Sequence, residues 1–137
     1  MNASEKVAWM EVVVTALSLA VVLILYPWLG YAATAGFGLL GFLGFGVVFM
    51  RQRGDEVVMD ERDQQILQHA TFQGFGIAWM GLFLSLIAVS MWHGYHEQAV
   101  PVYILIWLIW LQFALCYGIK GLLTLRAYRG DRRAAES

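Results

Sequence analysis

The sequence contains few charged residues, one cysteine and almost no net charge, and each of these excludes a class of protein. Charged residues are 14% of the chain, whereas soluble domains carry about a quarter. The net charge of −1 gives no basic face for phosphate groups, so direct nucleic-acid binding is excluded. Cys116 alone cannot form an intramolecular disulfide or a zinc site. The chain is instead 60% hydrophobic, a composition suited to lipid.

Four long apolar runs predict four transmembrane helices. A helix needs about 20 apolar residues to cross the hydrocarbon layer of a bilayer. The runs are continuous rather than alternating, and a spanning segment must satisfy its backbone hydrogen bonds internally, so helix is favoured over strand. The predicted fold is all-α: an integral membrane four-helix bundle of two transmembrane hairpins in a single domain, residues 1–137. The predicted spans are residues 7–29, 30–50, 71–92 and 102–125, joined at 51–70 and 93–101.

The lysines and arginines predict the orientation of the chain. All nine lie near the N-terminus, in the 51–70 loop or near the C-terminus, and the other loops carry none. Cytoplasmic loops of membrane proteins are enriched in Lys and Arg. Both termini and the 51–70 loop are therefore predicted to be cytoplasmic, and the 93–101 loop external. The nine residues are Lys6, Arg51, Arg53, Arg62, Lys120, Arg126, Arg129, Arg132 and Arg133.

Small residues recur at helical spacing in the second and third predicted spans. Such residues let helices approach closely in lipid, where dispersion between backbones is a main source of attraction. We expect the second and third helices to form the tight centre of the bundle. The sequence leaves open whether these residues pack within one chain or help to form a homodimer. The packing residues are Gly38, Gly41, Gly44, Gly74, Ala78, Gly81 and Ser85.

Three polar side chains lie inside the predicted spans. Glu11 and Lys120 lie at similar depths from the cytoplasmic side, and opposite charges at one level of a membrane tend to pair. A Glu11–Lys120 contact is therefore predicted; the alternative is that each side chain reaches the head groups separately. Gln112 lies near the middle of the fourth span and is predicted to hydrogen-bond to another helix.

The external loop contains two histidines and a glutamate within five residues, His93, His96 and Glu97. Imidazole and carboxylate groups are ligands for Zn²⁺ or Cu²⁺. The order His-x-x-His-Glu differs from the zinc-protease pattern His-Glu-x-x-His, and further external ligands are missing from the sequence. Polar histidines at the membrane interface are the alternative explanation, and no cofactor is predicted.

The segment MDERDQQILQHA, residues 59–70, is a polar interruption between the second and third spans. Asp60 is predicted to cap a helix, and Asp63 lies where the helix dipole favours a negative charge. This helix should continue without a break into the third span. Two readings remain open: a solvated helix start that fixes topology, or a docking surface for a cytoplasmic protein formed by Asp60, Glu61, Arg62 and Asp63.

A resemblance accompanies this segment. With Asp60 to Asp63 followed by Ile66 and Ala70, the chain resembles small four-span prokaryotic membrane proteins without an established activity, which carry a cytoplasmic D-E-R-D-type motif before the third helix. The resemblance implies an accessory or regulatory role in the prokaryotic inner membrane. The predicted function is thus a non-enzymatic membrane protein that presents a charged cytoplasmic helix to a partner. The alternatives are a small proton-coupled transporter using Glu11 and an external metal-binding module.

Overall fold

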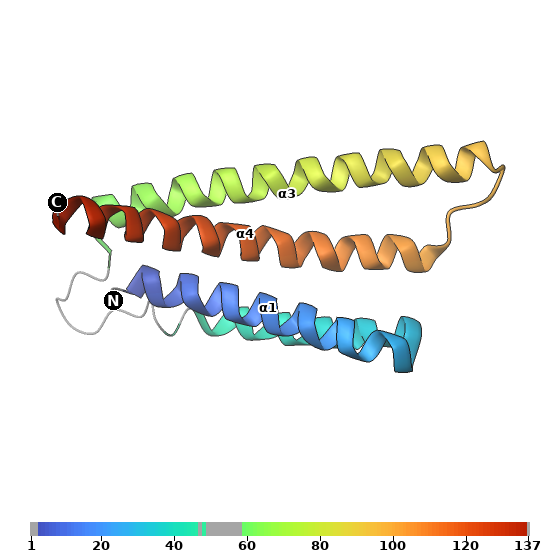
Figure 1. Cartoon of the computed structure of the whole chain (residues 1–137), viewed down its shortest axis with the longest axis horizontal. Coiled ribbons are helices and arrows are strands. Elements are labelled where there is room, and N and C mark those ends of the chain that lie inside the picture. The colour runs from blue at the N-terminus through green and yellow to red at the C-terminus, as the bar shows by residue number, and fades with distance from the viewer. Residues whose placement is uncertain (1–2, 47, 49–58, 137) are drawn as a thin grey trace.

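The computed structural model describes residues 3–46, 48 and 59–136, and the elements of this part are helices (Figure 1). The all-α prediction is confirmed for these residues. Residues 51–58 of the predicted 51–70 loop, together with residues 47, 49 and 50 of the second predicted span, lie outside the described residues. The elements are α1 (Ala3–Leu29), the 3₁₀-helix η1 (Gly30–Phe45), α3 (Glu61–Tyr95) and α4 (Val102–Glu136).

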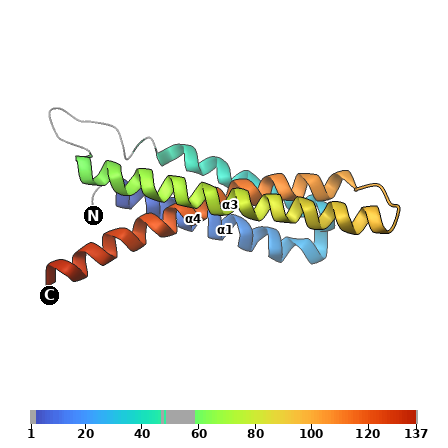
Figure 2. The same cartoon turned by 90° about the horizontal axis from the view of Figure 1, so that it is seen from above.

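The chain reverses between α1 and η1, so that η1 runs back beside α1 (Figures 1 and 2). Gly30 begins η1 with a φ of 54°, a left-handed conformation that glycine adopts without steric cost. The second predicted span is thus not the expected α-helix. A 3₁₀-helix has three residues per turn, and runs longer than three or four residues are uncommon. The 16 residues of η1 are an unusually long example.

Three helical stretches are long and apolar enough to cross a membrane: Ala3–Phe45, Glu61–Tyr95 and Val102–Ala135. By this criterion the first two predicted spans form one stretch, so the count of four crossings stays a prediction. Large apolar side chains on the outside of the molecule suit a lipid environment, including Trp28 and Phe72, which are 86% and 83% exposed. The described residues thus fit a bundle of membrane helices.

The helices pair differently from the prediction. η1 packs against α1, α3 packs against α4, and α1 packs against α4. The predicted tight centre between the second and third helices is wrong, because η1 and α3 share no extensive contact in the described part of the chain. The centre of the molecule is instead the contact between α1 and α4.

Aromatic stacking fixes η1 against α4 on the side away from the termini. Phe37 is fully buried, and its ring stacks on Trp110 at 5.9 Å and meets the edge of Trp107 at 5.8 Å. Such pairs contribute about 0.5–1.5 kcal/mol beyond the area they bury. One polar contact also joins α1 to η1, because the Ser18 hydroxyl donates to the Gly36 carbonyl oxygen at 3.1 Å. These contacts position η1 beside the central pair.

Candidate functional site

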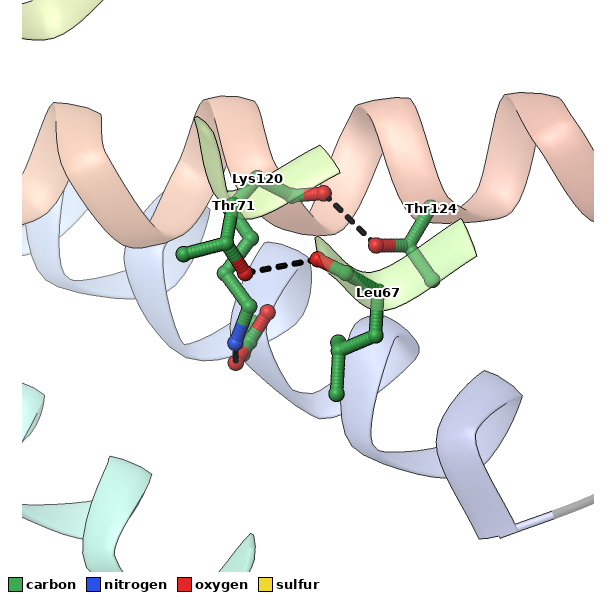
Figure 3. A network of polar contacts seen from close by, with 5 residues as sticks. Leu67, Thr71, Lys120 and Thr124 are labelled. Carbon is green, nitrogen blue, oxygen red and sulfur yellow. Dashed lines mark hydrogen bonds and ion pairs between the residues drawn. The ribbon is translucent and has the colours of Figure 1, made fainter. Parts of the chain in front are cut away.

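The site begins with the ion pair between α1 and α4. Lys120 Nζ donates to Glu11 Oε1 at 2.6 Å, and the two side chains are 13% and 6% exposed. The predicted contact between Glu11 and Lys120 is therefore confirmed. Figure 3 shows the Lys120 side chain extending from α4 toward α1. A pair this deeply buried has little water to screen it, so removing one partner would leave the other charge isolated.

Three glycines bring three helices together around Lys120. A Cβ atom on Gly74 of α3 would lie 2.8 Å from the backbone N and Cα of Lys120, and one on Gly118 would lie 2.9 Å from Thr15 Cγ2. A Cβ atom on Gly121 would lie 2.9 Å from the Ala8 carbonyl oxygen on α1. Glycine at these positions therefore permits the close approach of backbones that adhesion in lipid requires. The ion pair lies where α1, α3 and α4 converge.

Hydroxyl groups surround this convergence point. Thr124 donates to the Lys120 carbonyl oxygen at 2.9 Å, and Thr71 donates to the Leu67 carbonyl oxygen at 2.7 Å (Figure 3). On α1, the Thr15 hydroxyl is buried and has no hydrogen-bond partner among the described residues. A buried hydroxyl without a hydrogen bond costs about 1–3 kcal/mol of stability, so the Thr15 hydroxyl is an unusual feature beside the ion pair.

The start of α3 is capped by its own acidic residues. Asp60 Oδ1 accepts from the Asp63 backbone N–H at 2.7 Å, and Asp63 Oδ2 accepts from the Asp60 backbone N–H at 3.4 Å. This reciprocal capping box satisfies two backbone donors that a helix start leaves unpaired. The predicted cap at Asp60 is confirmed, and α3 continues unbroken from Glu61 to Tyr95, as predicted.

Two contacts then join the start of α3 to the end of α4. The Tyr128 hydroxyl donates to Asp63 Oδ1, and Arg62 pairs with Asp131 at 2.6 Å. The Arg62 side chain is 67% exposed, so this second pair contributes little to stability, about 0–1 kcal/mol. Three of the four D-E-R-D side chains therefore interact within the chain, and Glu61 lies exposed beside them. We call these contacts the α3 clamp: Asp60, Arg62, Asp63, Tyr128 and Asp131.

The remaining packing residues divide between buried and open positions. Gly74 and Ala78 are buried on α3, as the small-residue pattern predicts. The space around Gly38, Gly41, Gly44 and Gly81 is open, because a Cβ atom there would meet no atom within 4 Å. Ser85 donates to the Gly81 carbonyl oxygen of its own helix at 2.7 Å. In α3, the predicted row of small residues therefore packs against a neighbour only in the half nearer the start of the helix.

Gln112 does not make the predicted contact with another helix. Its Nε2 atom donates to Cys116 Sγ at 3.5 Å, one turn along α4. Residues four apart lie on the same face of a helix, so Cys116 Sγ of α4 itself accepts the hydrogen bond from the Gln112 amide. The interhelical prediction for Gln112 is wrong.

The outer turn differs from the predicted loop, because α3 continues to Tyr95 and includes His93. His93 Nδ1 lies 2.9 Å from the Val89 carbonyl oxygen, and His96 Nδ1 lies 2.8 Å from that of Trp92. Glu97 has a φ of 51° and ends the turn. Within residues 3–46 and 59–136, no group of three or more His, Cys, Asp or Glu side chains could hold a metal ion.

Some residues of the site were missed by the sequence reasoning. No sequence pattern singles out Tyr128 and Asp131, although both join the end of α4 to the start of α3. Gly118 and Gly121 were overlooked, although Ala114, Gly118 and Gly121 form a row of small residues on α4 at spacings of 4 and 3. This spacing is the same signal that singled out Gly74 and Ala78.

The comparisons with known proteins agree with this description. A family described as "predicted membrane protein (DUF2178)" matches residues 6–123. The chain belongs to this family. Membership establishes a membrane protein and gives no activity, since the family's function is unknown. The match covers the ion pair and the first half of the clamp, up to Asp63, and stops before Tyr128 and Asp131. No curated protein and no solved structure matches the chain.

Proposed function

We propose that the chain is a non-enzymatic accessory protein of the prokaryotic inner membrane that presents the start of α3 to a cytoplasmic protein. The α3 clamp carries this proposal, because it fixes about ten residues of helix, roughly 15 Å, beyond the apolar part of α3. A helix start held this firmly presents its outward side chains in a defined arrangement. Besides Arg62 of the clamp, the exposed polar residues of this segment are Glu61, Gln64, Gln65, Gln68 and His69.

The proposal includes a topology of four crossings with both termini in the cytoplasm. A 3₁₀-helix rises about 2.0 Å per residue, so the 16 residues of η1 extend over roughly 32 Å, enough for a hydrocarbon layer of about 30 Å. The N-terminus, the start of α3 and the C-terminus lie at the same end of the molecule (Figures 1 and 2). Positive charge gathers at this end, which we call the basic end.

The docking surface on α3 combines polar and apolar side chains. A groove of about 750 Å³ is lined by Gln64 and Gln68 near the helix start and by Leu67, Phe72 and Phe75 further along. An amphipathic helix of the partner fits the polar start of this groove, because its apolar face can cover Leu67 at the membrane surface while its polar face meets the glutamines; Phe72 and Phe75 remain toward the lipid. In this arrangement Asp60, Arg62 and Asp63 position the docking surface, and Glu61 belongs to it.

Affinity purification of three versions of the full-length protein tests this function. The Glu61→Ala/Gln64→Ala/Gln68→Ala variant should lose a stoichiometric cytoplasmic partner that the wild type retains, because it changes the surface and leaves the capping box intact. Gln98→Ala at the outer turn is the matched control and should retain the partner. The proposal fails if the wild type retains no partner, or if both variants lose it equally.

A homodimer is part of the same proposal. Gly38, Gly41 and Gly44 are exposed along one face of η1, where the three-residue period of the helix aligns them. In lipid such a face permits close approach of a second copy. A Gly41→Cys variant in a Cys116→Ala background should form a disulfide-linked dimer under oxidation, and a Leu23→Cys variant should not. Equal cross-linking of both would count against this dimer.

Transport is the second candidate, favoured by the burial of Glu11 beside the unpartnered Thr15 hydroxyl. A carboxylate at a helix convergence point can exchange a proton with a substrate cation. Its test is flux in liposomes: a proton gradient should drive uptake by the wild type and not by Glu11→Gln. The 2.6 Å contact with Lys120 favours the structural role, because it occupies the carboxylate.

A further inference from the structure

The groove between α1 and α4 at the basic end has a chemistry that the docking proposal does not use. It measures about 620 Å³ and is lined by three arginines, Arg126, Arg129 and Arg133. These residues are three and four positions apart, so they share one face of α4. The orientation of the chain in the membrane accounts for several arginines on this side. It does not account for three of them lining the same groove.

The walls of the groove change from apolar to basic along α4. Leu122 and Leu125 line it on the side nearer the membrane centre, and the arginines follow one to three turns later. On α1, Trp9 faces them, and the Arg129 guanidinium lies 5.7 Å from the centre of the Trp9 ring. This cation–π contact holds one arginine in the groove, and Trp is typical of the membrane interface.

The arginines retain their charge for a ligand. Among the side chains that the structure describes, the ion pairs are Arg62–Asp131 and Glu11–Lys120, and neither involves Arg126, Arg129 or Arg133. Asp131, the acidic residue nearest to them in sequence, pairs with Arg62 of α3 at 2.6 Å. Gly130 adds no side chain to the groove, and a Cβ atom there would meet nothing within 4 Å. Space and the positive charge of three arginines therefore coincide.

We propose that this groove binds one phospholipid with an anionic head group. Arginine recognises phosphate oxygens through paired N–H donors, so the phosphate lies among Arg126, Arg129 and Arg133. The acyl chain follows the apolar walls at Leu122 and Leu125. Basic pockets between membrane helices on the cytoplasmic side bind anionic head groups by this combination of contacts. The site lies on α1 and α4 and is independent of docking at α3.

Native mass spectrometry of the full-length protein tests the site, with phosphatidylglycerol and phosphatidylcholine of identical acyl chains as probes. The wild type should retain one phosphatidylglycerol in preference to phosphatidylcholine. In Arg126→Gln/Arg129→Gln, affinity for phosphatidylglycerol should fall by roughly 25-fold, about fivefold for each arginine. The matched control compares single charges: Lys6→Gln removes one exposed charge from the basic end outside the groove and should change the affinity by less than about twofold, whereas Arg126→Gln should lower it about fivefold.

Two further measurements separate the sources of binding. Arg129→Lys keeps the charge and loses the planar contact with Trp9, so an intermediate loss is expected. Excess inorganic phosphate should leave the lipid bound, because it cannot fill the apolar part of the groove. The proposal is overturned if the wild type retains both lipids equally, if the control variant loses as much as the groove variant, or if phosphate displaces the lipid. Circular dichroism verifies that each variant keeps its helical content.

Discussion

At the residue scale, the ion pair between Glu11 and Lys120 and the α3 clamp serve different purposes. The pair lies inside the bundle, with side chains 6% and 13% exposed, and joins α1 to α4. The clamp lies at the basic end, and its ion pair between Arg62 and Asp131 is largely exposed. Loss of one partner should therefore change the stability of the protein more at the buried pair than at the exposed pair, because burial removes the water that would otherwise screen the charges.

Removing Lys120 alone should destabilise the protein strongly. Lys120→Ala leaves the Glu11 carboxylate buried without its partner, a change that costs about 3–5 kcal/mol in comparable buried pairs. The double variant Glu11→Leu/Lys120→Met should lose less, because neither charge remains. Thermal unfolding in detergent measures both. A double variant as unstable as the sum of the single variants would contradict this role of the pair.

The Asp60 cap should control the opening of the first turn of α3. Asp60→Ala should reduce local helix stability by about 1 kcal/mol, because the Asp63 backbone N–H loses its acceptor. Asp60→Ser should retain most of the stability, since serine also caps helices. Hydrogen exchange at Asp63 and Gln64 reports the difference. Equal exchange in the two variants would show that the cap is not what holds the turn.

At the element scale, close approach of backbones decides which helices pair. Gly74 of α3 touches the backbone of Lys120, whereas Gly81, two turns further along the same helix, faces open space. The two glycines therefore form a natural comparison, because both lie inside α3 and differ in what surrounds them. Packing between α3 and α4 depends on the first and not on the second.

Alanine at these two positions should have opposite effects. Gly74→Ala places a methyl group 2.8 Å from backbone atoms of Lys120 and should cost about 1–3 kcal/mol as α3 and α4 separate. Gly81→Ala should be neutral or slightly stabilising, because alanine is the better helix former. Thermal unfolding of the two variants in the same detergent is the measurement. Similar destabilisation by both would contradict the assigned packing.

Local signals were sufficient to predict the helices, the cap at Asp60 and the pairing of Glu11 with Lys120. The helices and the cap depend on residues that are neighbours in sequence, and the ion pair depends on two residues at the same depth in the membrane. Sequence neighbours and depth can both be counted along the chain. The choice of partner helices could not be predicted, because η1, α3 and α4 all carry small residues at helical spacing. Only the assembled structure distinguishes the exposed row at Gly38, Gly41 and Gly44 from the buried Gly74 and Gly121.

The conformation of η1 and the contact of Gln112 were missed for related reasons. An apolar run rich in glycine favours neither an α-helix nor a 3₁₀-helix strongly, and packing of Phe37 against Trp110 contributes to the result. Gln112 lies deep enough to need a partner, and depth does not tell whether that partner lies on another helix or one turn away at Cys116.

At the scale of the whole molecule, the two ends differ in chemistry. The basic end gathers both termini, the clamp and the two grooves of the proposals. The outer end carries the turn from His96 to Pro101 and a further groove lined by aromatic rings, including Tyr26, Tyr31 and Tyr103, which neither proposal uses. A membrane protein whose interaction surfaces lie at one end acts on one side of the bilayer. Docking at α3 and lipid binding between α1 and α4 would then occur side by side at the cytoplasmic face.

Photo-cross-linking in intact cells tests the docking proposal most directly. A benzophenone amino acid at Gln64, within the groove on α3, should yield one discrete adduct with a cytoplasmic protein. The same amino acid at Gln98, at the outer turn, should yield no such adduct, because the proposed topology places that position across the membrane. Absence of an adduct at Gln64, or the same adduct from both positions, would contradict docking of a cytoplasmic partner at the start of α3.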